Sequence, residues 1–274
     1  MIHVKRSKDV PATLISDRVK DARKAIADIA AKGKPMSDQF KSLWGEKDVR
    51  QALWIMQNKK CGYCERRRDV NRESDIDHFR PKAEVTMAPD HTGYWWLAYE
   101  WKNLLFSCRH CNQSYKVNHF PIPVEAKRVT NDAQKLSEER AYLIDPCGED
   151  EDPESCFTYY VKEMKLAPGE TEILVYVDAR PDDEWNRERA DRTISVLGLN
   201  RRDLLEERGK CVEKLKLLAG KMYYVKHLAD DEAKVKNSEA AAQIRDATRA
   251  SLPFAGFCRA YFRSLGFGDY VSTD

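Results

Sequence analysis

The sequence has little net charge and no long apolar run, and each absence excludes a class of protein. Its 274 residues include 47 lysines and arginines against 45 acidic residues, which gives a formal net charge of only +2. Such a chain has no molecule-wide field that attracts nucleic acid, so any nucleic-acid site must come from local clusters of cations. No apolar run approaches the roughly 20 residues of a membrane helix, so we expect no membrane partner.

Two further sequence signals are missing. The first residues, MIHVKRSKDVPATL, contain no apolar core of a secretion signal, so we expect a cytoplasmic protein. No G-x-x-x-x-G-K-S/T loop occurs, so any nucleotide sensing would have to come from another protein.

The sequence does contain two CxxC pairs, which use four of its eight cysteines. A chain of this length without an export signal favours metal binding over disulfides. Four thiolates at this spacing can close a tetrahedral Zn²⁺ site with a structural role. The predicted zinc ligands are Cys61, Cys64, Cys108 and Cys111. The remaining cysteines lack paired spacing and are interpreted as ordinary core or surface thiols.

Residues between and just after these pairs suit phosphodiester hydrolysis. Asp77 and Asn112 offer oxygen ligands to Mg²⁺ or Mn²⁺, which would activate a water and relieve charge on the phosphate. His78 is a suitable general base because an imidazole titrates near neutral pH. Asn103 is placed to orient either a loop or the imidazole of His78. Phosphate contacts are predicted for four nearby side chains: Lys116, Arg80, Lys82 and His119.

The local patterns predict two strands and a helix around these residues. Strands are expected over 75–79 and 103–107, and a helix is expected over 109–117. On a regular strand Asp77 and His78 point to opposite faces, so their joint use at one site requires a twist or a turn. On the helix Asn112 and Lys116 share a face. The predicted fold class is α+β, a zinc-stapled ββα-metal (HNH) nuclease module embedded in a mainly helical body.

Four segments are expected along the chain. An N-terminal extended arm with helices, broken at Gly33-Lys34-Pro35, covers 1–57, and the nuclease module covers 58–121. An irregular and β segment over 122–180 contains candidate strands at 157–161 and 173–177 around a Pro168-Gly169 turn. A charged helical region over 181–274 carries an apolar leucine stripe and a possible helix cap at Asn237-Ser238, and it is a candidate docking surface for a partner.

Several stretches resemble a known family. CGYC, DIDHFRPKAEV and YWWLAYEWKNLLFSCRHCNQSYK are similar to the PtuB family, the HNH nuclease subunit of Septu-type antiphage systems, which also occurs with retrons. The resemblance implies a base at His78, metal ligands at Asp77 and Asn112, and zinc at the four cysteines. It further implies a defence role, an ABC/SMC-like ATPase partner of the PtuA type, and, for retron-associated members, a retron RNA/DNA element. The last letter of the HNH motif is Asn112 here, an amide that suits Mg²⁺.

Two other functions remain open from the sequence. One is a catalytically silent zinc module that scaffolds the complex or binds nucleic acid, and the presence of Asp77, His78, Asn103 and Asn112 argues against it. The other is a stand-alone restriction-type HNH endonuclease, and the lack of a recognisable target-recognition domain argues against that. Both DNA and RNA remain open as substrates.

Overall fold

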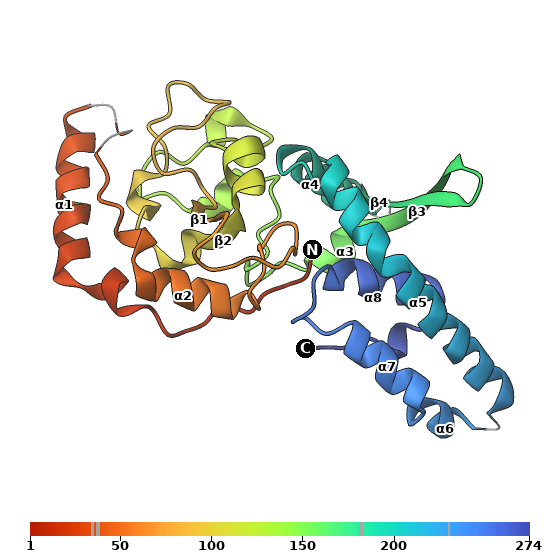
Figure 1. Ribbon diagram of the computed structural model, residues 1–274. Coiled ribbons are helices and arrows are strands. Elements are labelled where there is room, and N and C mark those ends of the chain that lie inside the picture. The colour runs from red at the N-terminus through yellow and green to blue at the C-terminus, as the bar shows by residue number, and fades with distance from the viewer. Residues whose placement is uncertain (34–35, 37–38, 181–182, 230) are drawn as a thin grey trace.

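The computed structural model describes residues 1–33, 36, 39–180, 183–229 and 231–274. Figure 1 shows two lobes: α1, α2 and the β1–β2 pair form one, and the β3–β4 hairpin with α5 to α8 forms the other. The elements are α1 (Asp17–Ala31), α2 (Lys47–Met56), β1 (Ser74–His78), β2 (Leu104–Cys108), a π-helix (His110–Lys116), α3 (Pro153–Cys156), β3 (Phe157–Ala167), β4 (Glu170–Ala179), α4 (Glu184–Val196), α5 (Arg202–Leu228), α6 (Glu232–Lys236), α7 (Glu239–Ala247) and α8 (Ala255–Ser264). The predicted break at Lys34-Pro35 lies outside the described residues.

The first lobe is built on the antiparallel pair β1–β2. The register places Ser74 opposite Cys108 and His78 opposite Leu104, without irregularity. Both predicted strands are confirmed, each within one residue of the expected bounds. The predicted helix is a seven-residue π-helix, closed by a bond from the N–H of Val117 to the carbonyl of Asn112 at 2.7 Å. Val117 has φ +46°, a conformation that a β-branched residue rarely adopts, and it ends the π-helix there.

Two cores cover opposite faces of this strand pair. On one face Ile76 and Phe106 pack against Val19 of α1 and Leu53 of α2. On the other face Leu105 and the four cysteines of the CxxC pairs join a core that extends into the second lobe. The segment 58–121 is therefore packed between the N-terminal helices and the C-terminal body. Its apolar strand β2 is fully buried because both faces are covered.

The second lobe is a long β-hairpin crossed by the 27-residue helix α5. The predicted turn is confirmed at Gly169, which has φ +84°, although both strands are longer than expected. The apolar stripe of α5 faces inward, as the sequence predicts. Helix and sheet approach so closely that a Cβ on Gly209 would lie 1.9 Å from the carbonyl oxygen of Ile173. Ser238 caps α7 as expected, since its hydroxyl accepts a bond from the N–H of Ala241.

No helix in the described part of the chain combines the length and the apolar character needed to cross a membrane. The longest, α5, carries both charged residues and exposed apolar side chains, among them Leu217 and Tyr224, on its outer face.

The first residues of the predicted N-terminal arm are packed against the body of the protein. Met1, Ile2 and Val4 are buried, and the N–H of Val4 donates to the carbonyl of Pro146 at 2.7 Å. The amino group of Met1 lies 3.2 Å from the buried carboxylate of Glu65. This contact ties the chain start to the loop after the first CxxC pair, so only the later part of the arm is exposed.

Acid is expected to weaken this anchor through Glu65. Burial favours the neutral carboxyl, but the Met1 ammonium and Lys60 outweigh burial and lower its pKa from 4.5 to about 2. A carboxyl whose pKa falls on folding stabilises the protein above its unfolded pKa, and that stabilisation is lost as the pH drops from about 4.5 towards 2. Glu65→Gln should cost roughly 3 kcal/mol at pH 7 because it leaves buried cations unpaired.

Urea unfolding at neutral and acid pH measures this difference. The gap between wild type and Glu65→Gln should shrink as the pH falls through that window. Glu149→Gln, which removes an exposed carboxylate, should leave stability unchanged at both pH values. A gap that stays constant with pH would contradict the assignment.

Candidate metal centre and active site

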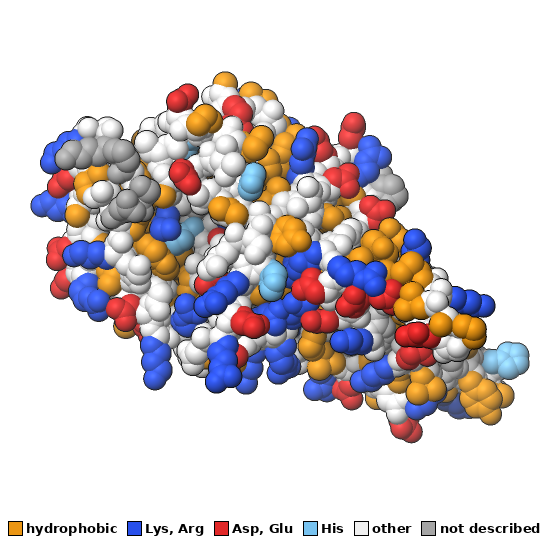
Figure 2. All heavy atoms as spheres, turned by 45° about the horizontal axis from the view of Figure 1, so that its top comes forward, with side chains coloured by type: hydrophobic (Ala, Val, Ile, Leu, Met, Phe, Trp, Pro, Cys, Tyr) orange, Lys and Arg blue, Asp and Glu red, His pale blue; other side chains and the backbone are white. Residues whose placement is uncertain are grey.

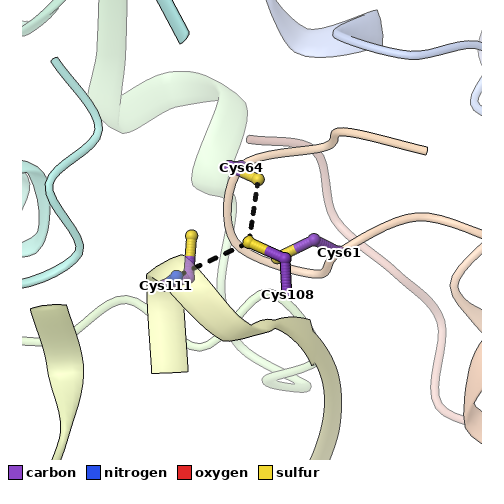
Figure 3. A group of neighbouring side chains, drawn as sticks. All are labelled: Cys61, Cys64, Cys108 and Cys111. Carbon is purple, nitrogen blue, oxygen red and sulfur yellow. Dashed lines mark hydrogen bonds between the residues drawn. The ribbon is translucent and has the colours of Figure 1, made fainter. Parts of the chain in front are cut away.

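The four cysteines of the CxxC pairs gather at one buried point. Cys61 and Cys64 come from a tight turn before β1, whereas Cys108 ends β2 and Cys111 lies in the first turn of the π-helix (Figure 3). Their Sγ atoms all lie within 4.8 Å of one another. The sulfurs of Cys64 and Cys108 are 3.8 Å apart, far too long for a disulfide. Thiolates around a tetrahedral zinc ion, with Zn–S near 2.3 Å, lie about 3.8 Å apart.

The cluster therefore fits a metal such as zinc. All four residues are fully buried, which leaves no open position for a substrate and points to a structural role. The surrounding thiols of Cys111, Cys61 and Cys64 lower the pKa of Cys108, as a tight group of sulfurs around one anionic centre requires.

A cation from the second lobe faces these sulfurs. The Arg201 guanidinium, just before α5, donates to Cys111 Sγ at 3.5 Å and lies 3.9 Å from Cys108 Sγ. Burial opposes its charge, yet the neighbouring thiolates raise the pKa of Arg201. A zinc ion held by the four thiolates would carry two negative charges, and Arg201 would compensate part of them. The metal cluster thereby joins the two lobes electrostatically as well as by packing.

His78 lies at the end of β1 with its tautomer fixed. Its Nε2 is 2.9 Å from the carbonyl oxygen of Ala98, which can only accept, so Nε2 carries the hydrogen and Nδ1 is left to accept a proton. Burial, together with the charges of Lys82 and Lys116, lowers the pKa of His78 well below its usual range. The imidazole is therefore neutral at pH 7, the form that a general base requires.

An aromatic and a cation border this imidazole. The Trp44 ring meets His78 edge-on with ring centres 4.7 Å apart. The ammonium of Lys82 lies 4.8 Å from the centre of the same Trp44 ring. Lys82 is half-buried, so it is the predicted phosphate contact that stays beside the base.

Asp77 points to the opposite side of β1 and is already engaged. Its Oδ2 accepts a bond from the Tyr63 hydroxyl at 2.5 Å, and its Oδ1 lies 3.2 Å from the Lys116 ammonium. Lys116 also donates to the carbonyl of His78 at 2.8 Å and is fully buried. β1 pairs with β2 without a register shift, and Asp77 contacts Lys116 while His78 contacts Trp44, so the expected convergence of their side chains is absent.

The predicted magnesium ligands do not meet in this arrangement. Asn112 Nδ2 donates to Asp75 Oδ2 at 3.3 Å rather than approaching Asp77. The shared face of Asn112 and Lys116 is confirmed, because residues four apart on the helix contact residues two apart on the strand. A divalent ion at Asp77 would have to displace the Lys116 ammonium or the Tyr63 hydroxyl. Asp77 and Asn112 as placed therefore do not fit a shared Mg²⁺ or Mn²⁺ ion.

Asn103 holds the loop that follows β1 in place through hydrogen bonds to its backbone. Its Oδ1 accepts from the N–H of Arg80 at 2.8 Å, and its Nδ2 donates to the carbonyls of Arg80 and Leu97. Of the two roles that the sequence leaves open, the structure shows the loop-holding one. Since Leu97 precedes Ala98, Asn103 also fixes the turn that supplies the acceptor of His78.

The other predicted phosphate contacts are placed less favourably. Lys116 has no exposed surface. Arg80 forms an ion pair with the buried carboxylate of Glu139, with Nε 3.1 Å from Oε2. His119 is half-buried in the loop after the π-helix, where its N–H donates to the Lys116 carbonyl. Direct phosphate contact by Lys116 does not fit this geometry.

Sequence reasoning missed several residues around the site. Tyr63 was read only as part of a CxxC turn, and its hydroxyl partner Asp77 lies on the following strand. Trp44 and Arg201 come from distant segments and carry no motif. One signal was available in the sequence. Lys116 lies four residues after Asn112 on the helix, so it shares the face that packs against β1, where it meets Asp77.

Breaking the Lys116–Asp77 pair is expected to destabilise the protein strongly. Lys116→Met leaves a buried carboxylate with only the Tyr63 hydroxyl as partner, which should cost about 3–5 kcal/mol in urea unfolding. Adding Asp77→Asn should restore much of that loss, because the uncompensated charge is then gone. Lys102→Met, which removes an exposed ion pair with Glu149, should have no measurable effect. Equal losses for the single and double variants would contradict this interpretation.

Three similar proteins match parts of the chain, although no protein-family model does. It is 33% identical over 176 residues to the Septu protein PtuB of Bacillus mycoides (strain KBAB4), covering 63% of this chain and 53% of that protein. A second Septu protein PtuB, from Bacillus thuringiensis, is 33% identical over 113 residues, or 41% of this chain and 36% of the relative. The Septu protein PtuA of Bacillus mycoides is 32% identical over 159 residues, or 56% of this chain and 19% of the relative. The chain thus spans about half the length of the first relative and less of the others.

Proposed function

Because this chain belongs to the PtuB family of Septu proteins, we propose that it is the nuclease subunit of an antiphage defence system. In this proposal the β1–β2 pair and the π-helix act as an HNH-type unit that hydrolyses nucleic-acid phosphodiester bonds. The cysteine cluster holds zinc and keeps the unit folded.

The observation that carries the proposal is the state of His78. Its Nε2–H is held by the Ala98 carbonyl, and its lowered pKa keeps Nδ1 free to take a proton from water. The resulting hydroxide attacks phosphorus, the P–O bond to the leaving sugar oxygen breaks, and that oxygen takes up a proton from solvent. Lys82, beside the same Trp44 ring, supplies positive charge that offsets the growing charge on the phosphate oxygens. Asn103 positions the loop that carries both Arg80 and the acceptor of His78.

A requirement for a divalent ion is tested in the cleavage assay, but no residue is assigned to hold that ion. The HNH resemblance implies Mg²⁺ or Mn²⁺, whereas Asp77 is engaged by Tyr63 and Lys116. We therefore assign no step to a metal ion. Cutting that requires added Mg²⁺ or Mn²⁺ would mean that Asp77 releases Lys116 when substrate binds.

A partner of the PtuA type belongs to the same proposal. The Septu relatives include a protein named PtuA, and the chain lacks a nucleotide-binding loop of its own. An ABC/SMC-like ATPase would supply nucleotide sensing and regulate the nuclease. The exposed outer face of α5 and the arm after Val4 are the candidate docking surfaces.

A cleavage assay tests this function. Purified protein is incubated with plasmid DNA or bulk tRNA, in Mg²⁺, Mn²⁺ or EDTA, with and without a PtuA-type partner. Cutting by the protein with its partner supports the proposed defence nuclease, and cutting at a defined sequence by the protein alone supports a restriction-type enzyme. Absence of cutting in every condition would overturn the nuclease assignment.

A second candidate function is a zinc module without catalysis. The saturation of Asp77 by a hydroxyl and an ammonium favours it, because a nuclease that uses Asp77 for a metal leaves that carboxylate accessible. Binding of nucleic acid or of the partner without any cutting would select this alternative.

A further inference from the structure

Two neighbouring cavities form a basic groove beside the segment that follows the first CxxC pair. The first, of about 580 Å³, lies between the loop after Cys64, α5 and the segment before α8. The second, of about 590 Å³, runs along 67–73 to Arg109. Both are lined by Arg67 and Arg68, so they form one continuous groove. Its cations are Arg67, Arg68, Arg72, Arg109, Lys210 and Lys214.

The cations of this groove outnumber its acids, which are Asp69, Glu73 and Glu207. Lys210 and Lys214, four residues apart on α5, are both exposed on the face of the helix that borders the groove. Glu207, the acid in that wall, is neutralised from below by buried Arg66 at 2.8 Å. Glu73 lies 3.9 Å from Arg68 and is mostly exposed, so it screens little. Figure 2 shows many Lys and Arg side chains across the lower middle of one face, with Asp and Glu side chains among them.

The loop over 66–73, which carries most of these arginines, is anchored at both ends. Arg66 pairs with Asp203 and Glu207 of α5, and it follows directly on the zinc-cluster turn and Glu65. At the other end, the N–H of Arg109 donates to the carbonyl of Glu73 at 3.2 Å. The groove therefore runs from α5 past the metal cluster to the start of the π-helix. Arginine guanidinium groups on a fixed loop suit the forked geometry of phosphate oxygens.

We propose that this groove binds the phosphodiester backbone of a nucleic acid. Its length over two cavities, its arginine content and its excess of cations over acids fit a polyanion better than a small ligand. The inference rests on the proposed nuclease function only for its purpose, because the groove would hold the polymer that His78 cuts. Phosphate binding is thereby assigned to residues other than Asp77, His78, Asn103 and Asn112. The small net charge of the chain is then concentrated where the substrate lies.

Binding is measured with the full chain in a His78→Ala background, so that no substrate is consumed. Fluorescence anisotropy follows a labelled DNA duplex, its single strand and an RNA of the same sequence over a range of salt concentrations. The test variants are Lys210→Glu with Lys214→Glu, and Arg72→Glu with Arg109→Glu. The matched control makes the same charge change at exposed lysines of the first lobe, Lys24→Glu with Lys47→Glu.

Each groove variant is expected to bind at least tenfold more weakly near 0.1 M salt, with a salt slope reduced by about 1 to 2 because phosphate contacts are lost. Zinc content and unfolding should match those of the control. Groove variants that bind like the control, or a His78→Ala chain that binds no nucleic acid, would overturn the proposal. Groove variants that bind nucleic acid normally but lose a protein partner would assign the groove to an acidic protein surface instead.

The cleavage assay keeps this result separate from the proposed function. Loss of binding in the groove variants while the wild type never cuts would leave the groove in place and reject the nuclease. Normal cutting and normal binding by the groove variants would instead support the nuclease and reject the groove.

Discussion

Replacing Cys108 by serine is expected to release the metal and to unfold much of the protein. Cys108 ends β2, and its sulfur lies in the middle of the cluster, 3.8 Å from Cys64 and within reach of the Cys111 N–H. Zinc binding contributes roughly 10–16 kcal/mol to the folding of small zinc modules, which is about as large as a typical domain's whole stability. Three remaining thiolates would hold zinc far more weakly and leave the added hydroxyl buried.

The loss should reach beyond the first lobe. Arg201, which faces Cys108 and Cys111, would be left buried without its anionic partner. Zinc content by mass spectrometry and hydrogen exchange of both lobes measure the effect, and chelation of the wild type should reproduce it. Cys211→Ala, a half-buried cysteine outside the cluster, should keep the zinc. A folded Cys108→Ser protein without metal would show that the cluster is dispensable.

The features that the sequence predicts well are local. Each strand and the helical turn follow from alternation and spacing over a few residues, and two CxxC pairs specify a common point by themselves. The same alternation that defines β1 also places Asp77 and His78 on opposite faces. The structure follows this simple pattern, and the side chains of Asp77 and His78 do not converge on one site as their joint use would require.

The features that the sequence does not predict depend on contacts between distant segments. Tyr63 and Lys116 reach Asp77 from a turn before β1 and from a helix after β2, and neither distance nor charge pairing is visible in a linear pattern. The burial of Met1 depends on Glu65, whose acidic side chain would ordinarily be assigned to the surface. The local sequence of 1–12 shows that the segment carries exposed charged residues. It cannot show that Met1 will be buried against the distant carboxylate of Glu65.

The basic groove illustrates the same limit. The run Arg66-Arg67-Arg68 is visible in the sequence, but α5 decides what each arginine does. Arg66 turns inward to two acids of that helix, whereas Arg67 lies exposed beside Lys210 and Lys214 on the groove wall. A chain with almost no net charge thus gathers more cations than acids in one groove, because folding brings the 66–72 segment, Arg109 and α5 together.

Replacing His78 by alanine is expected to abolish cutting while folding and zinc content persist. The imidazole contributes one bond to Ala98 and an edge contact with Trp44, so its loss affects packing modestly. General-base catalysis contributes typically 10²–10⁴-fold, and a loss of that size brings cutting below detection in an ordinary assay. His227→Ala, on the exposed end of α5, should cut like the wild type.

The pH dependence separates a base from a merely structural histidine. His78 acts when neutral, and burial together with Lys82 keeps its pKa well below 6.5. Cutting by the wild type should therefore be flat from about pH 6.5 upwards and fall only at more acid pH. Lys82→Met removes a charge that lowers this pKa, so the acid limb should move to higher pH while the maximum rate also falls. An unchanged profile in Lys82→Met, or a His78→Ala variant that cuts like the wild type, would reject His78 as the base.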